Sequence, residues 1–300
     1  MADVTNDPTA LSADAAAPRV EQESRWVTVR RAFRTAPLTA WFGMIVILLY
    51  IFTAIFAPVL APFGEKEIVG DAFDVPGDEY FLGTDQLGRD MLSRMIYAAR
   101  NTVGIALATT ILSFTIGAFF GMLAAVLGGW TDNILSRIVD VLMSIPQLIF
   151  ALLLLTILGA NVINMILVIA LLDSTRVYRL MRAVGMNIVV MDYVEAAKLR
   201  GEGLWWLISK EILPNALAPL IAEFGLRFCF VFLTIAALSF LGLGIQPPTA
   251  DWGTMVRDNA QLITFGEIIP LYPAAAIALL TVAVNFVVDW MLHRSSGLKE

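Results

Sequence analysis

The chain has 300 residues, of which 58% are hydrophobic and only 15% are charged, and its mean hydropathy is +0.77. These values lie far from those of a soluble domain and predict an integral membrane protein. The net charge of −6 gives no reason to expect a nucleic-acid partner. One cysteine and one histidine exclude an internal disulfide, a CxxC metal or redox site and a catalytic site built on several histidines.

The N-terminal part divides into a polar tail and a first hydrophobic segment. Residues 1–24 are rich in Ala, Asp, Glu, Thr and Pro without apolar periodicity, and we expect them to be disordered. Arginines follow, and residues 38–60 are apolar and uncharged, which predicts a first transmembrane helix after a tail of residues 1–37. A cleaved signal peptide is the alternative, but its apolar core would be only about 7–15 residues long and would begin earlier.

The rest of the chain alternates between one long polar segment and further apolar runs. Residues 61–100 are polar and acidic, and the core that follows, residues 101–292, contains five apolar runs of membrane-spanning length. With the first helix they predict an all-α integral membrane protein with six transmembrane helices. The five runs cover residues 101–128, 134–158, 162–181, 216–243 and 269–292.

The distribution of Lys and Arg near the span ends predicts the orientation, because these residues resist translocation. They are concentrated before the first span and in the loop 182–215, whereas the loop 244–268 contains only Arg257. The segment 61–100 also contains basic residues, but acidic residues accompany them. We therefore expect both termini, including the tail 293–300, and the loop 182–215 in the cytoplasm, and the segment 61–100 in the periplasm.

The loop 182–215 has the pattern of two short helices with a glycine joint. Asp192 is placed to cap a first helix that ends at Gly201, and Gly203 loosens the joint. A second, amphipathic helix follows, and Pro214 marks the point where the chain turns back toward the membrane. The apolar stripe of this second helix is predicted to contain Leu204, Trp205, Ile208 and Ile212.

Small side chains on the first helix would let another surface approach the backbone closely. The order Glu195-Ala196-Ala197, then Gly201, then Ile212-Leu213-Pro214 resembles the EAA loop of ABC importer permeases. In that family the loop forms a coupling helix that sits in a cleft of the ATPase subunit. The resemblance therefore implies an ATPase-coupling surface made of Glu195, Ala196, Ala197, Lys198, Leu199, Arg200 and Gly201.

The resemblance has one departure, and the segment has one alternative interpretation. Glu211 stands where many members carry a basic or histidine residue, so the charge at this position is opposite to that of those members. An interfacial amphipathic helix without a partner is the alternative, since Trp205 and Trp206 suit a membrane surface. The spacing of the EAA pattern favours the coupling interpretation.

Two outer segments narrow the subfamily. FLGTDQLGRD at residues 81–90 resembles the segment before the second span in the second permease of dipeptide, oligopeptide and nickel importers. LGLGIQPP at residues 241–248, with Asp251-Trp252-Gly253, resembles that family's outer loop between the fifth and sixth spans. The resemblance runs from about residue 36 to the end, as judged from these motifs.

Both outer segments also have features of their own. Asp90 and Arg94 are four residues apart and could pair on an entering helix. A rigid Pro-Pro turn beside an exposed tryptophan offers a place where a substrate-binding protein could dock, although ordinary loop structure is the alternative. The residues of this predicted docking surface are Gln246, Pro247, Pro248, Asp251 and Trp252.

Ionisable residues inside spans are functional candidates by default, because burying them in a membrane is expensive. Glu223 and Arg227 are four residues apart with the acid first, which predicts a structural ion pair on one helix. A proton relay is the alternative, but several of these charges lie near span ends, where water reaches them. Gly117 and Gly121 form a small face that predicts helix packing. The ionisable candidates are Asp140, Asp173, Glu223, Arg227 and Asp289.

The sequence contains no GxxxxGK[ST] motif, so it lacks the backbone cradle that holds ATP phosphates. No nucleophile, base and metal cluster can be assembled either, and we expect neither an enzyme nor a cofactor in this chain. The resemblance implies a type I ABC importer permease fold in a bacterial inner membrane. It also implies a heterodimer with a homologous permease, two ATPase subunits that bind ATP and Mg, and an external substrate-binding protein.

The expected function is ATP-driven import of dipeptides or oligopeptides. The same architecture could import nickel, glutathione, opines or oligosaccharides instead. Two other classes stay open: an ion-coupled secondary transporter that uses the intramembrane acids, and a membrane scaffold that transports nothing.

Overall fold

The computed structural model describes residues 36–295, and in this range the chain is helical apart from loops and one isolated bridge between Thr84 and Asp90. The predicted tails, residues 1–37 and 293–300, lie almost wholly outside the described residues, although the last helix continues to Ser295. In chain order the elements are α2 (Leu38–Leu60), α3 (Met91–Leu127), α4 (Gly129–Met143), α5 (Gln147–Leu158), α6 (Val162–Val189), α7 (Asp192–Leu199), α8 (Leu204–Trp206), a π-helix (Leu207–Ile212), α9 (Leu213–Phe240), α10 (Trp252–Asn259), a 3-10 helix (Ala260–Phe265) and α11 (Leu271–Ser295).

Four described helices are long and apolar enough to cross a membrane: α2, α3, α11 and the part of α9 that begins at Pro219. The pair α4 and α5 makes a fifth candidate if it is counted as one broken span. Helix α6 is not among them, since Asp173, Arg176 and Arg179 interrupt its apolar sequence. The described helices therefore support four or five spans by length and composition, and the count of six stays a prediction.

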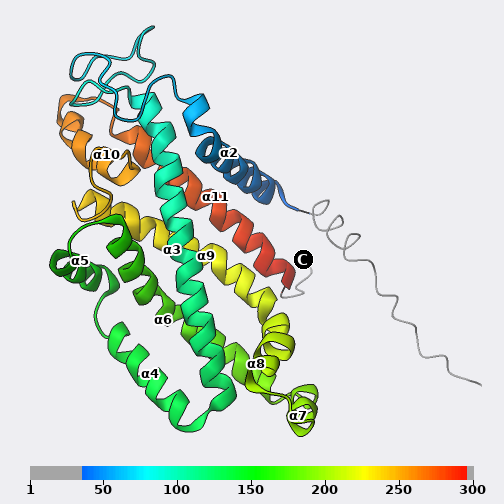
Figure 1. Ribbon diagram of the computed structural model, residues 1–300. Helices are drawn as coiled ribbons and strands as arrows, with labels where there is room; N and C mark the ends of the chain where they lie inside the picture. Colours follow the sequence, from blue (N-terminus) through cyan, green and yellow to red (C-terminus); the bar gives the residue numbers. More distant parts are fainter. Residues whose placement is uncertain (1–35, 296–300) are drawn as a thin grey trace, which may run out of the picture. The chain divides into compact units, whose positions relative to one another are not determined.

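The apolar run predicted as one span over residues 134–158 does not form a single continuous helix. Two helices, α4 and α5, occupy this region and meet at an angle of 86° across residues 144–146. Pro146 explains the break, because a proline ring clashes with the helical conformation of the preceding residue and has no N–H to donate. Figure 1 shows α5 turned away from the direction of α4.

Helices α3 and α6 pack closely through the two glycines of the predicted small face. A Cβ atom added at Gly117 would lie 2.6 Å from the carbonyl oxygen of Ser174, and one added at Gly121 would lie 2.8 Å from that of Tyr178. Only a hydrogen atom fits at these two positions. The predicted packing role of both glycines is confirmed.

Gly117→Ala is expected to lower the free energy of unfolding by about 1–3 kcal/mol, because the added methyl group forces α3 and α6 apart. Gly104→Ala is the matched control on the same helix, since nothing lies within 4 Å of its added Cβ. That change should be neutral or slightly stabilising, given the higher helix propensity of alanine. Thermal unfolding of both purified variants in detergent measures the difference, and equal shifts would contradict the packing argument.

The polar segment 61–90 is held to the start of α3 by buried ion pairs and hydrogen bonds. Asp85 Oδ2 lies 2.6 Å from Arg89 Nη2 and 3.3 Å from Arg94 Nε. Asp90 does not pair with Arg94 as predicted; it caps α3 by accepting a hydrogen bond from the Ser93 N–H at 2.7 Å. The partner of Arg94 is therefore Asp85, which the folded loop brings close, and not Asp90, which is four residues away on the chain.

Candidate functional site

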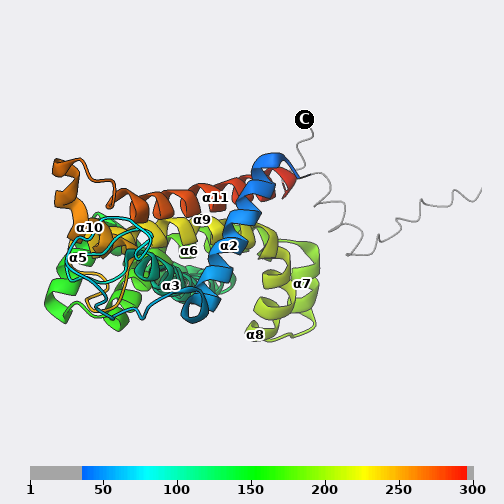
Figure 2. The ribbon, with the colours of Figure 1, turned by 90° about the horizontal axis from the view of Figure 1, so that it is seen from above.

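The short helix α7 and the segment after it lie at one end of the helical bundle. Figure 1 shows α7 and α8 at the end opposite to α10 and the loops of residues 61–90. The same pair stands beside the ends of the long helices in the view of Figure 2. The two predicted contact surfaces, one for an ATPase and one for a binding protein, are therefore on opposite ends of the bundle.

Helix α7 ends as the sequence predicts but begins differently. Gly201 has φ = +81°, its N–H donates to the Lys198 carbonyl at 3.0 Å, and the Glu202 N–H donates to the Ala197 carbonyl at 3.2 Å. These two bonds close a Schellman motif that needs a residue in the left-handed conformation. The predicted cap at Asp192 is wrong, because Met191 is the N-cap and Asp192 lies in the first turn, where its charge suits the helix dipole.

The two faces of α7 differ in exposure. Glu195, Ala196 and Leu199 are exposed, and Leu199 has 83% of its surface accessible although it is apolar. Val194 and Ala197 are fully buried. The prediction that Ala196 and Ala197 both face a partner is therefore wrong for Ala197, whose small side chain fits against the rest of the protein.

The buried face of α7 belongs to a hydrophobic cluster that we call the α7 cluster. It joins α7 to the ends of three long helices, because Met122 lies on α3, Ile188 on α6 and Leu220 on α9. Interiors of this kind are close-packed and transmit displacement instead of absorbing it. The full α7 cluster contains Met122, Met181, Ile188, Val194, Ala197, Leu207, Ile208, Ile212, Ala216 and Leu220.

The second predicted helix is present but has an unexpected geometry. Residues 207–212 form a π-helix, and the chain is helical without interruption from Leu204 to Phe240, so Pro214 marks no turn. The wider π turn changes which side chains share a face, so that Leu207 joins Ile208 and Ile212 in the interior. The predicted stripe is wrong at Leu204 and Trp205, which are 36% and 69% exposed.

Arg200 connects the two helices of this segment. Its guanidinium carbon lies 5.7 Å from the centre of the Trp206 ring, and its Nε lies 3.7 Å from Glu202 Oε1. Lys198 is exposed in the last turn of α7. The exposed face of α7 thus carries charge of both signs beside the apolar Leu199.

The predicted ion pair between Glu223 and Arg227 is confirmed, with Glu223 Oε1 2.7 Å from Arg227 Nε. Sequence spacing did not reveal that Arg227 also reaches Asp173 on α6, whose Oδ1 lies 3.7 Å from Arg227 Nη1. Asp173 also accepts a hydrogen bond from Ser113 on α3 at 2.9 Å. These contacts link α3, α6 and α9 through one buried charge network.

The other two ionisable candidates lie in more exposed places. Asp140 pairs with Arg179 at 2.7 Å, and both side chains are more than half exposed. Asp289 is exposed on α11. One further pair, missed in the sequence, joins Asp132 of α4 to Arg182 of α6 through two hydrogen bonds.

The predicted docking surface at residues 246–252 is only partly accessible. Gln246, Pro247 and Pro248 are exposed. The expectation of an exposed tryptophan is wrong, because Trp252 is 2% exposed, contacts the Tyr50 and Phe232 rings edge-on and donates a hydrogen bond to the Met95 carbonyl at 3.2 Å.

Asp251 is also unavailable to a partner. It is fully buried, caps α10 by accepting a hydrogen bond from the Thr254 N–H at 2.9 Å, and accepts another from the Thr102 hydroxyl at 2.8 Å. Burial raises the pKa of this carboxyl above its ordinary value. Asp251 and Trp252 thus fix the outer loop against α3 and are structural residues.

Residues 36–295 contain no group of three or more His, Cys, Asp or Glu side chains that could hold a metal ion. The arrangement offers an exposed short helix, α7, that packs through the α7 cluster against the three long helices α3, α6 and α9.

Comparison with known proteins agrees with this architecture. Residues 24–75 match the N-terminal TM domain of oligopeptide transport permease C, and residues 117–296 match the binding-protein-dependent transport system inner membrane component. The chain is 36% identical to the di/tripeptide transport system permease protein DppC of Pseudomonas aeruginosa over 82% of this chain and 84% of that protein.

Two further relatives cover similar shares of the sequence. The probable D,D-dipeptide transport system permease protein DdpC of Escherichia coli is 33% identical over 93% of this chain and 94% of its own length. The glutathione transport system permease protein GsiD of Pectobacterium atrosepticum is 30% identical over 88% of each chain. The chain therefore belongs to the family of binding-protein-dependent transport system inner membrane components, as a multi-pass permease that is not itself catalytic.

Proposed function

We propose that this chain is the permease subunit of an ATP-driven importer of dipeptides or oligopeptides in a bacterial inner membrane. It forms half of a translocation path with a homologous permease, spans the membrane six times and keeps both termini in the cytoplasm. Two separate ATPase subunits bind ATP and Mg, and an external binding protein delivers the solute. The printed names of the relatives, most of which are peptide transport permeases, favour peptides over glutathione as the substrate class.

One observation carries the mechanism: α7 is exposed on one face and embedded by the other in a cluster shared with α3, α6 and α9. When the ATPases close on nucleotide, they displace the exposed face. The close-packed α7 cluster passes that displacement to the three long helices, and the two permeases switch between inward-open and outward-open. Glu195, Ala196, Lys198 and Leu199 are the contact residues under this proposal, and Gly201 fixes the end of α7.

Neighbouring alanines provide a sharp test of this contact. Ala196→Cys places a thiol on the exposed face of α7, whereas Ala197→Cys places it in the α7 cluster. In inside-out membrane vesicles that contain the whole complex, a short thiol crosslinker should join the ATPase to the first variant and not to the second. Crosslinking of neither variant, or labelling of residue 196 only from the periplasmic side, would contradict the proposal.

Uptake measurements separate this proposal from an ion-coupled carrier. Proteoliposomes that contain the complex and the binding protein should accumulate dialanine only when ATP is enclosed with the ATPases. Dissipation of the proton and sodium gradients should leave that uptake unchanged. Uptake that survives without ATP and collapses with an ion gradient would favour the secondary-transporter class.

A further inference from the structure

The elbow between α4 and α5 encloses a small cavity that the coupling mechanism does not use. Its volume is about 130 Å³, which is enough to hold water but is well below the roughly 300 Å³ of a complete small-molecule pocket. A cavity of this size fits one polar end of a solute. Its lining residues are Leu142, Met143, Ile145, Pro146, Gln147, Leu172, Thr175 and Arg176.

The backbone around this cavity is unusual for a membrane protein. The break at residues 144–146 leaves non-helical backbone between two apolar helices that together could make one span. Such backbone is tolerated at membrane depth where protein buries it or where it lines a water-filled cavity. Helix α5 also begins at Gln147 without a side-chain cap for its first N–H groups. Polar surroundings at the elbow would satisfy these groups.

Arg176 supplies the charge of the cavity. Among the described residues its guanidinium makes no hydrogen bond or ion pair; it lies 6.0 Å from guanidinium carbon to the centre of the Phe230 ring and interacts electrostatically with Asp173. The nearby acids are already engaged: Asp140 contacts Arg179, and Asp173 contacts Ser113 and Arg227. A guanidinium carries five N–H donors that match a carboxylate in a planar, two-bond contact.

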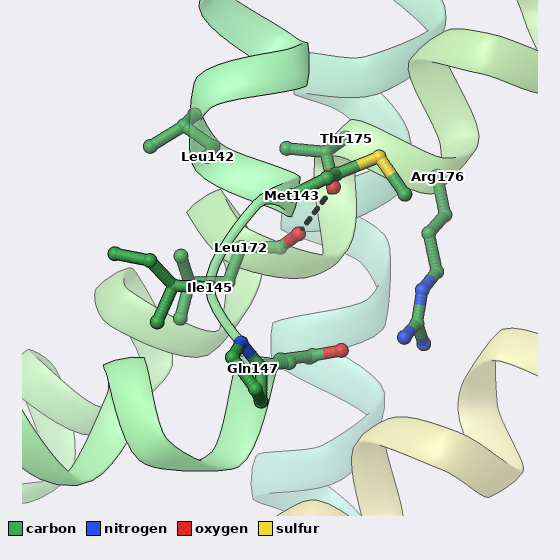
Figure 3. Close-up of a pocket in the computed structure, with 8 residues that line it drawn as sticks. Leu142, Met143, Ile145, Gln147, Leu172, Thr175 and Arg176 are labelled. Carbon is green, nitrogen blue, oxygen red and sulfur yellow. Dashed lines mark hydrogen bonds between the residues drawn. The ribbon is translucent and has the colours of Figure 1, made fainter.

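The opposite wall of the cavity contributes an amide. Figure 3 shows the Gln147 side chain, from α5, and the Arg176 side chain, from α6, extending into the same space. The Thr175 hydroxyl is not available, because it donates to the Leu172 carbonyl at 2.7 Å. The remaining lining side chains are apolar, so Arg176 and Gln147 are the two groups that can orient a ligand.

We propose that this cavity binds the carboxylate end of the solute as it passes through the permease. The inference rests on the proposed function and adds a place on the translocation path. Arg176 holds both carboxylate oxygens, Gln147 provides a further hydrogen bond from its amide, and the apolar walls exclude competing water. The rest of the solute extends beyond the elbow, where this chain leaves the cavity open.

Electrostatics make this a site for brief binding. Asp173, Glu223, Arg176 and Arg227 sum to zero charge, so a bound carboxylate makes the region negative by one unit. The carboxylate gains the free donors of Arg176 but is repelled by the buried acid network. Weak binding of this kind suits a transport path, which must release what it binds.

The transport test uses dialanine and its C-terminal amide as probes in proteoliposomes with the complete complex and binding protein. The quantity measured is the ratio of the two uptake rates. The binding protein is the same in every sample, so a change of ratio between variants comes from the permease. Arg176→Gln is expected to lower the ratio about tenfold, the loss expected for one charge-assisted contact. Arg176→Lys should lower this uptake ratio less than Arg176→Gln does.

Arg179→Gln is the matched control, one helical turn further along α6, and its partner Asp140 lies outside the cavity. This change should alter both uptake rates by the same factor. Gln147→Leu should lower the ratio by a smaller factor than Arg176→Gln. An unchanged ratio in an assembled Arg176→Gln complex would overturn the proposal.

A complex that does not transport dialanine would contradict the proposed function but would leave the carboxylate site untouched. A separate binding test therefore examines the site without transport. Saturation-transfer NMR with millimolar acetate detects weak carboxylate binding to the complex in phosphatidylcholine nanodiscs. Acetate signal in the wild type that is lost in Arg176→Gln supports the carboxylate site. Equal acetate signals in the wild type and in Arg176→Gln would overturn the proposal. A wild-type acetate signal that disappears when phosphatidylglycerol is added would also overturn it, because the cavity would then bind a lipid phosphate.

Discussion

Gly201→Val should let the complex assemble and hydrolyse ATP while uptake falls by at least about tenfold, which corresponds to a free-energy change of about 1.4 kcal/mol. The reason is the φ of +81° at Gly201, a conformation that costs an L-residue roughly 1–2 kcal/mol and is least accessible to a β-branched side chain. Valine relieves this strain by reorienting the end of α7, so the ATPase would push on a displaced helix. ATP hydrolysis and dialanine uptake, measured on the same proteoliposomes, give the coupling ratio.

Two variants isolate the backbone effect from the effect of bulk. No atom lies within 4 Å of a Cβ added at Gly201 or Gly203, so both sites have room for a side chain. Gly203 has an ordinary φ of −73°, and Gly203→Val should therefore keep normal coupling. Gly201→Asn should recover much of the loss, because asparagine tolerates the left-handed conformation. Equal defects in both valine variants would contradict the role assigned to the Schellman motif.

Arg227→Met is expected to lower the free energy of unfolding by about 3–5 kcal/mol, because it leaves Asp173 buried without a cation in contact. Methionine fills similar space, so loss of packing contributes little. Arg179→Met removes the partner of Asp140, but that pair is 52% and 60% exposed, and the expected cost is only about 0–1 kcal/mol. Thermal unfolding of the purified complexes compares the two changes.

A second substitution distinguishes the charge effect from a general defect at residue 227. Adding Asp173→Asn to Arg227→Met removes the isolated buried carboxylate and keeps an acceptor for Ser113. The double variant should be more stable than Arg227→Met alone. A double variant that is less stable than the single one would show that Asp173 does not depend on the arginine.

Local sequence rules predicted the features that short-range chemistry controls. Gly201 ends α7 because its φ demands glycine, and the Glu223 and Arg227 pair forms because four residues bring side chains together on any helix. Gly117 and Gly121 pack α3 on α6 for the same periodic reason. Apolar runs located α2, α9 and α11 to within three residues at each end, whereas α3 begins ten residues before its predicted run and α6 ends eight residues after its own.

The features that depend on distant parts of the chain could not be predicted in this way. Trp252 looked like an exposed loop residue, but partners on α2, α3 and α9 bury it. Arg94 pairs with Asp85 because the loop folds back, although Asp90 is at the helical spacing. Ala197 and Ala196 are adjacent and chemically identical, and only tertiary packing decides which of them is buried.

Helix α3 is 37 residues long, about 55 Å at 1.5 Å per residue, whereas the hydrocarbon of a bilayer is about 30 Å thick. Near its start Arg94 contacts Asp85 of the polar segment, and near its other end Met122 enters the α7 cluster. No proline interrupts α3 between these points. If the permease works as proposed, α3 would move as one unit, and a tilt imposed at one membrane face would also displace its end at the other. Closing one gate and opening the opposite one would then be a single rigid-body movement, with no separate signal between them.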